Sequence, residues 1–503
     1  MSGIRSSGLR SAFVAVVVAL LASACATPVG VSRISPSAAY QLHAVSALSS
    51  EEPSEPSKTV LRRLGLMDRF DKEPATVLAE LHKDIGHSGD DDELLFALAE
   101  LSFLHGERSG DRAYFLGSAV YAYALLFPGQ GDRVGLDRSD PRLRLAYDLY
   151  NQGVAQGLSI PSGDALKGTS TRAVMRDENA EVQLQAGTKR LPFGTLTLDL
   201  DATGLTWGGY QLEHFVSTTT FNIRGLRNRY RRPGIGAALA ASLANTQSGQ
   251  KFVGAERIGP RAKVPVTAFA RLDDVRAGLA SGRIHGRLEV YSSDRASTVT
   301  VDGRERPLEF DSSAALAYQL DKSPLYSLEL LSFLRGGMVG NLLLRDNKRT
   351  GDGLFTMQPY QRGKFPLVLV HGTASSPVRW AELFNELEGD PRIRDRFQIW
   401  VFLYDTGNPV GYSAGRLRAA LTAAVTEFDP AGTDPALHQM VVIGHSQGGL
   451  LTKLTAIDTG DQLWDRISSK PFDQVELPAD TRQVLQQSMF FKPLPFVSRA
   501  VFI

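Results

Sequence analysis

Cysteine is almost absent from this chain, with Cys25 standing alone among 503 residues. No internal disulfide can form, and there is no set of cysteines and histidines with metal-ligand spacing. Net charge is also small, at +1, which argues against a nucleic-acid-binding protein because such proteins usually carry a basic excess. A glycine-rich phosphate loop is missing as well, so we predict neither a metal nor an organic cofactor.

A long hydrophobic run is missing from the N-terminus, where the apolar stretch Ala12–Ala22 is too short to cross a membrane comfortably. Arg5 and Arg10 precede this stretch, and small residues follow it up to Cys25. A basic start, a short apolar segment and small residues are typical of a secretory signal. The sequence therefore predicts an exported protein.

The end of this segment, Ala-Ser-Ala-Cys at 22–25, resembles a bacterial lipobox, although Ala22 stands where that pattern prefers leucine. The resemblance implies that Cys25 carries the lipid that holds the protein to a membrane. Ala26, rather than aspartate, follows Cys25, as in outer-membrane lipoproteins. We expect a cell-envelope lipoprotein of the outer rather than the inner membrane. A plain signal peptide, or a signal anchor with an incidental cysteine, is the alternative.

Patterning divides the rest of the chain into regions of different structure. Apolar residues at helical spacing follow an acidic start at 90–93, strand-like alternation begins with Gly194–Leu200, and Asp302-Gly303 lies between two such stretches as in a hairpin. Short, almost continuously apolar strands then alternate with helical patterns, which is typical of a parallel α/β sheet. The predicted parts are a signal peptide at 1–24, a flexible tether at 25–58, an α-helical region at 59–155, a β-rich region at 160–345 and an α/β domain at 353–503.

Two charged stretches each allow two interpretations. The carboxylates Asp90–Glu93 suit the positive end of a helix dipole, and a metal cluster is the alternative. Arg224–Arg232 contains five arginines and would suit either anionic headgroups near a membrane or a salt-bridged surface.

A serine lies between an apolar strand and a helical pattern in the stretch VVIGHSQGGL. The strand Met440–Ile443 leads directly to it, and Gly444 and Gly448 flank Ser446 where a sharp turn leaves no room for side chains. Such a turn exposes the serine hydroxyl and points a helix N-terminus at it, which favours negative charge there. This pattern predicts a nucleophilic serine.

Together with the strand that ends in His371-Gly372-Thr373, these residues resemble the α/β-hydrolase superfamily, and in particular its lipases and esterases. The matching motifs are HGT at 371–373 and GHSQGG at 444–449, so the resemblance covers 353–503 only. It implies that Ser446 is the nucleophile and that Gln447 and Thr373 supply the oxyanion hole.

A base for this serine is missing, because none of the nine histidines lies beyond His445. The family order places the acid and then the histidine after the serine, so neither His371 nor His445 fits as the base. The final stretch reads as the next strand of the sheet, and we infer a C-terminally truncated sequence whose acid and base lie beyond residue 503. The aspartates between Ser446 and that strand read as surface residues: Asp458, Asp461, Asp465, Asp473 and Asp480.

The predicted function is hydrolysis of carboxylic esters, through an acyl-enzyme on Ser446, by a membrane-anchored lipase- or esterase-like protein. The substrate would be an ester or lipid-like molecule, and this chain itself is expected to be inactive. A non-catalytic envelope lipoprotein, which uses a degenerate hydrolase domain as a binding scaffold, is the alternative. The protein partner of the helical region is unknown from the sequence.

Overall fold

The computed structural model describes residues 29–87, 91–129, 136–160, 180–247, 253–259, 261–321, 353–373 and 375–503. The chain divides into two compact units, residues 1–55 and 56–503. In the first unit, α2 (Pro36–His43) begins after Ser35, whose side chain accepts a hydrogen bond from the backbone of Ala38. Cys25 and Asp90 lie outside the described residues.

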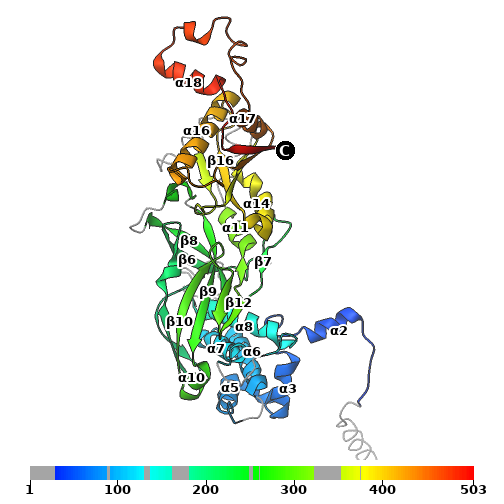
Figure 1. Ribbon diagram of the computed structural model, residues 1–503. Helices are drawn as coiled ribbons and strands as arrows, with labels where there is room; N and C mark the ends of the chain where they lie inside the picture. The colour runs from blue at the N-terminus through cyan, green and yellow to red at the C-terminus, as the bar shows by residue number, and fades with distance from the viewer. Residues whose placement is uncertain are drawn as a thin grey trace, which may run out of the picture. The chain divides into compact units, whose positions relative to one another are not determined.

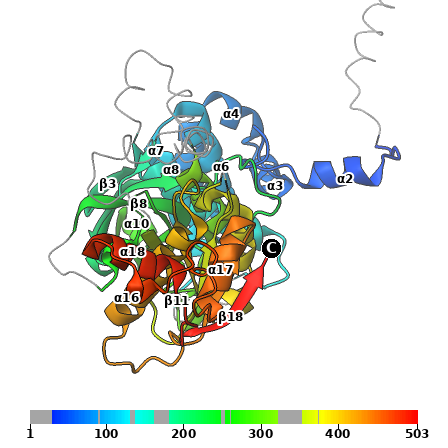
Figure 2. The same ribbon diagram turned by 90° about the horizontal axis from the view of Figure 1, so that it is seen from above.

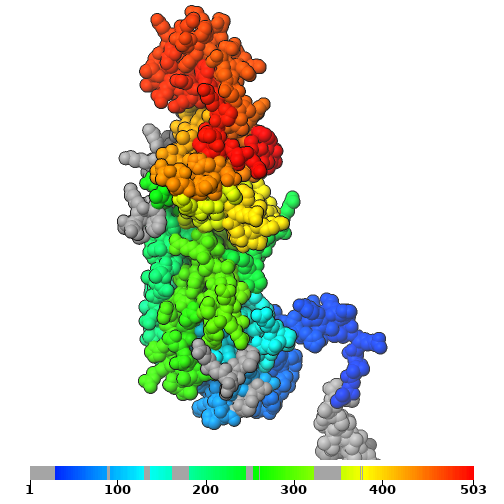
Figure 3. Space-filling model, viewed as in Figure 1, coloured from blue at the N-terminus to red at the C-terminus, as the bar shows by residue number. Residues whose placement is uncertain are grey.

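The second unit opens with a bundle of helices. Its core is α6 (Asp91–Ser109), α7 (Arg112–Leu126) and α8 (Arg142–Gly157), preceded by α3 (Glu55–Arg63), α4 (Met67–Lys72) and α5 (Pro74–Lys83). Almost every residue of α7 is buried, which is why its sequence shows no polar face. Figure 3 shows the residues of α3–α8 (blue to cyan) against the part of the chain that follows (green).

A nine-stranded sheet follows, in the order β1-β2-β6-β8-β9-β10-β4-β3, with β5 paired to β6. All its pairs are antiparallel except β10–β4. Figure 1 shows its central strands β6, β8, β9 and β10. The strands are β1 (Ser159–Ile160), β2 (Glu181–Val182), β3 (Gly187–Leu191), β4 (Gly194–Leu200), β5 (Thr206–Trp207), β6 (Tyr210–Ser217), β8 (Ala237–Gln247), β9 (Lys263–Asp273) and β10 (Arg283–Ser292).

Two short strand pairs and two helices accompany this sheet. The predicted hairpin is confirmed: β11 (Thr298–Val301) pairs with β12 (Arg304–Pro307), and Asp302 and Gly303 both have positive φ, as a two-residue turn requires. The strand β7 (Arg231–Arg232) pairs with β13 (Phe310–Asp311). The helices are α10 (Val275–Ser281) and α11 (Ser312–Leu320), and the side chain of Asp311 caps α11.

Helix α8 is joined to the sheet by buried polar side chains. The hydroxyl of Tyr150 donates to the carbonyl of Ala270 (2.7 Å) and accepts from its N–H (2.9 Å). Ala270 lies beyond the end of the β8–β9 pairing, which stops at Ala268. The tyrosine hydroxyl therefore takes the place of a missing strand neighbour.

The arginine-rich stretch forms ion pairs with carboxylates that are almost completely buried. Arg231 contacts Glu309 at 2.5 Å, and Arg229 contacts Asp311 at 2.5 Å. The guanidinium of Arg232 lies 4.5 Å from the centre of the Phe310 ring. For Arg229 and Arg231 the structure supports the interpretation as a salt-bridged surface, whereas Arg232 stacks on an aromatic ring.

The last sheet has five strands in the order β14-β16-β15-β17-β18. Its strands are β14 (Gly353–Thr356), β15 (Phe365–Val370), β16 (Phe397–Leu403), β17 (Met440–Gly444) and β18 (Val497–Phe502). Its helices are α14 (Ala381–Gly389), α15 (Pro391–Arg394), α16 (Val410–Phe428), α17 (Gln447–Ala456) and α18 (Ala479–Met489). Viewed from above, α17 lies between α16 and β18 (Figure 2).

The predicted fold class, an α/β protein with a parallel α/β-hydrolase sheet, is wrong, because this sheet is mixed. Strand β14 runs antiparallel to β16, whereas the pairs β15–β16, β15–β17 and β17–β18 are parallel. The short connection 357–364 between β14 and β15 contains no helix, and a parallel crossover needs a dozen residues or more. Within the described ranges, no helix combines the length and the apolarity that crossing a membrane requires.

The role of Tyr150 can be tested by removing its hydroxyl. Tyr150→Phe leaves the N–H and the carbonyl of Ala270 without this partner, so we expect it to lower the free energy of unfolding by about 1–3 kcal/mol in urea titrations. Tyr147→Phe, on the same helix, is the matched control, because the structure gives the hydroxyl of that half-buried tyrosine no hydrogen bond among the described residues. Equal effects of the two substitutions would contradict this role.

Candidate functional site

Ser446 occupies a strained turn between β17 and α17. Its φ is 53° and its ψ is −120°, a combination that non-glycine residues rarely adopt and that costs about 1–3 kcal/mol. The side chain is exposed, and α17 begins at the next residue. No acidic residue lies in the first turn of α17, so nothing there offsets the positive end of its dipole.

Glycines permit the backbone contacts that hold this turn. A methyl group on Gly448 would lie 2.3 Å from the carbonyl oxygen of Val370, and one on Gly444 would lie 2.3 Å from the carbonyl oxygen of Gly448. Gly372 is equally close to the serine, because a methyl group there would lie 2.9 Å from the Cβ of Ser446. The structure thus brings the 371–373 segment directly against the serine turn.

The two residues expected to form an oxyanion hole lie side by side. The hydroxyl of Thr373 donates to Oε1 of Gln447 at 3.0 Å, and Nε2 of Gln447 donates to the carbonyl of Thr406 at 3.3 Å. Gln447 is the first residue of α17, so its backbone N–H has no acceptor within the helix. This N–H group is therefore available for a ligand oxygen near Ser446.

His371 is buried, and both of its ring nitrogens take part in hydrogen bonds. Its Nδ1 lies 3.1 Å from the carbonyl oxygen of Gly372, and its Nε2 accepts a hydrogen bond from the backbone of Tyr404 at 3.4 Å. The Tyr404 ring stacks on the imidazole at 4.5 Å, and the Tyr404 hydroxyl donates to the carbonyl of His371. Burial lowers the pKa of His371 to about 4, so the ring is neutral at pH 7.

The second nearby imidazole, that of His445, is exposed, and the Trp380 ring lies nearly perpendicular to it, with the ring centroids 6.3 Å apart. His438 precedes β17, whereas Ser446 follows that strand, so they belong to opposite ends of it. Among the residues that the structure describes, no histidine is recorded in a hydrogen bond with the Ser446 hydroxyl. The five aspartates Asp458, Asp461, Asp465, Asp473 and Asp480 are all exposed.

Side chains that the sequence did not single out also shape this end of the sheet. Tyr404 follows β16 directly. Its position near the serine turn could have been inferred from the sequence, because the carboxyl ends of parallel strands meet at one edge of a sheet. Trp380, which precedes α14, carries no such signal. The described residues contain no group of three or more side chains suited to a metal ion. The proposed lipidation site, Cys25, is outside them.

Known proteins provide no further guide to this site. No protein-family model matches the chain, and neither a curated protein nor a solved structure matches it. The resemblance to the α/β-hydrolase superfamily therefore stays a prediction from the two motifs.

The depressed pKa of His371 predicts a specific pH dependence of stability. Its pKa is about 4 in the folded chain and near 6.5 when unfolded, so its contribution is complete above pH 6.5 and is lost as the pH falls toward 4. By pH 5 the loss amounts to about 2 kcal/mol. Urea unfolding between pH 7.5 and 5 should show this slope in the natural chain and a flatter one in His371→Gln. His445→Gln, which alters an exposed ring, is the control, and a slope unchanged by His371→Gln would refute the assignment.

Proposed function

We propose that this chain belongs to a serine hydrolase of carboxylic esters, anchored to a membrane through Cys25. The observation that carries the proposal is the exposed hydroxyl of Ser446 on a strained turn at the N-terminus of α17. Strain of this kind persists only where the surrounding structure enforces it, and it gathers at functional sites.

The chemistry would proceed by attack of the Ser446 oxygen on the ester carbonyl, which releases the alcohol and leaves an acyl-enzyme for water to hydrolyse. The backbone N–H of Gln447, the residue after the serine, would donate to the developing oxyanion, and the second donor would come from Thr373, whose side chain is bonded to Gln447. The helix dipole of α17 favours the same negative charge.

A specific observation also favours the alternative, a non-catalytic envelope lipoprotein. His371 is neutral, buried and occupied on both nitrogens, so it cannot take the serine proton. A serine without a base is a poor nucleophile at neutral pH. In this alternative the turn at Ser446 would be a binding feature.

Covalent labelling separates the two functions. If the hydrolase proposal is right, an alkyl fluorophosphonate probe should label a form of the protein that carries the acid and the base, and Ser446→Ala should abolish the labelling, because only that hydroxyl stands on the strained turn. Ser375→Ala, which removes a serine shortly after Thr373, is the control and should label normally. Labelling that persists in Ser446→Ala would refute the assignment of the nucleophile, and no labelling of the form that carries the acid and the base would favour the binding protein.

Turnover gives a second readout of the same site. We expect this chain to hydrolyse p-nitrophenyl acetate no faster than Ser446→Ala does, because no histidine in the described residues is placed to act as its base. Measurable turnover that Ser446→Ala removes would contradict this expectation.

The anchor is tested separately from the chemistry. The envelope location rests on the signal at 1–25 and on the lipobox-like end of that signal, which has Ala26 after the cysteine. Bacteria fed radiolabelled palmitate should incorporate it into the natural chain and not into Cys25→Ser, which should also leave the detergent phase in a Triton X-114 partition. Incorporation that survives the substitution would rule out Cys25 as the modified residue.

A further inference from the structure

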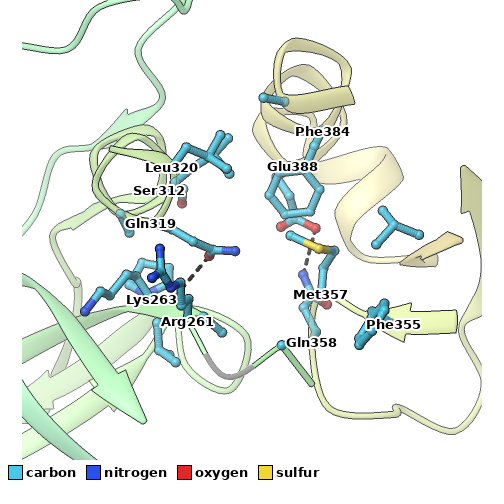
Figure 4. Close-up of a pocket in the computed structure, with 18 of the residues that line it drawn as sticks. Arg261, Lys263, Ser312, Gln319, Leu320, Phe355, Met357, Gln358, Phe384 and Glu388 are labelled. Atoms are coloured by element: carbon cyan, nitrogen blue, oxygen red, sulfur yellow. Dashed lines mark hydrogen bonds between the residues drawn. The ribbon is translucent and has the colours of Figure 1, made fainter. Parts of the chain in front are cut away.

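Among the described residues, incompletely covered apolar side chains gather at two places away from the serine turn. One is a cavity of about 350 Å³ beside α14, where Leu320 of α11 lies opposite Phe384 of α14 (Figure 4). Both side chains are half-buried, so the walls of the cavity already shield much of their surface. The other place is the first unit of the chain, where the apolar side chains lie on the outside.

The start of the first unit carries a concentration of exposed apolar side chains. Of the fourteen large apolar side chains that are exposed in the described parts of the chain, six lie between residues 29 and 48. They are Val29, Val31, Ile34, Tyr40, Leu42 and Leu48. Single exposed apolar residues are normal, whereas a group of them on one short segment marks a surface for a partner.

Helix α2, in the middle of this segment, is too short to be stable by itself. Isolated helices of fewer than about 12 residues are marginal in water, and α2 has 8. Ser35 caps it and Pro36 begins it, yet none of its residues is buried. In most proteins, a helix owes its stability to an apolar face that packs against something. A partner that covers α2 would supply this stability.

The apolar residues of α2 define the face that a partner would cover. Ala38 and Leu42 are four positions apart and share one side of the helix, next to Ala39. The side chain of Leu42 is 61% exposed. Tyr40 precedes Leu42 by two positions and therefore lies on the opposite side. The two sides of α2 thus differ in what they offer to a partner.

The charge of this segment favours one kind of partner. The chain contains 54 acidic residues, and the first of them is Glu51. Between Cys25 and Glu51 the only lysine or arginine is Arg33, which lies among the exposed apolar residues. Apolar side chains beside a basic one, without carboxylates, suit an anionic lipid surface, because apolar groups enter the acyl boundary while basic groups meet the headgroups.

The residue that is predicted to carry the lipid lies close to this segment along the chain. Ten residues separate Cys25 from Pro36, so a fully extended connection spans at most about 40 Å. A lipid on Cys25 would therefore keep α2 within reach of the membrane, at an effective concentration on the order of millimolar. At such a concentration even a weak contact with the surface forms.

We propose that residues 29–42 form a second membrane contact on an anionic lipid surface, with Val31, Ile34 and Leu42 at the acyl boundary and Arg33 among the headgroups. The proposal rests on the membrane anchor proposed at Cys25 and does not depend on ester hydrolysis.

A fluorescent label on each side of α2 tests this contact in the lipid-modified full chain. Cys25 is the only natural cysteine and its thiol would carry the lipid, so Ala39→Cys and Ser37→Cys each provide a single site for the dye NBD. In vesicles of phosphatidylethanolamine and phosphatidylglycerol, we expect the emission at residue 39 to shift to the blue and to be quenched by doxyl-labelled lipids. Residue 37, on the opposite side, is the matched control and should stay in water. Equal quenching at both positions, or none at residue 39, would overturn the proposal.

Further substitutions separate the contact from the anchor. In the Ala39→Cys chain, Leu42→Ser should lower the equilibrium constant for insertion about tenfold, because one leucine side chain leaves the acyl boundary, whereas Gln41→Ser should change it little. Palmitate that is not incorporated at Cys25 would remove the anchor, whereas a palmitate-labelled chain without quenching at residue 39 would remove the contact alone. A blue shift of the same size in the Cys25→Ser form without vesicles would mean that the chain itself covers this face, and would also contradict the proposal.

Discussion

The turn at Ser446 depends on backbone segments that approach more closely than side chains would allow. Gly372, Gly444 and Gly448 each face the backbone or Cβ of a neighbouring segment at less than 3 Å from where a methyl group would stand. The turn is also held by hydrogen bonds from the His445 N–H to Val370 and from the Ser446 N–H to Ile503. The ends of β15, β17 and β18 thus hold the serine in a conformation that an isolated peptide would leave, which is how a fold retains local strain.

The arginine-rich stretch connects the parts of the second unit through buried charge. Glu309 forms an ion pair with Arg231. It also accepts a hydrogen bond from the side-chain amide of Asn151, on α8, with 3.0 Å between Nδ2 and Oε2. Further along the stretch, Asn228 donates to Glu386 of α14 at 2.9 Å. Buried ion pairs of this kind add little net stability, yet removing one partner is costly because the other charge stays buried. These contacts join α8, the strand pair β7–β13 and α14 through one stretch of the chain.

Local patterns in the sequence predicted what depends on local geometry. The hairpin at Asp302-Gly303 follows from the positive φ values that such a turn requires, and the serine turn follows from the glycines on either side of it. The prediction of a parallel sheet was wrong because β14 runs antiparallel to β16. That pairing joins two segments that are far apart in the sequence. The parallel pairing of β10 with β4 and the cavity beside α14 have the same non-local origin. His371 belongs to a motif that the sequence shows, but only the fold reveals that the backbone N–H of Tyr404 donates a hydrogen bond to its Nε2.

Trp380 belongs to two places in the molecule at once. One part of its surface lines the cavity beside α14, and its indole ring lies nearly perpendicular to that of His445, the residue before Ser446. Trp380 also packs in the core on one face of the last sheet, so a substitution of this one side chain alters that core and the neighbour of the serine together.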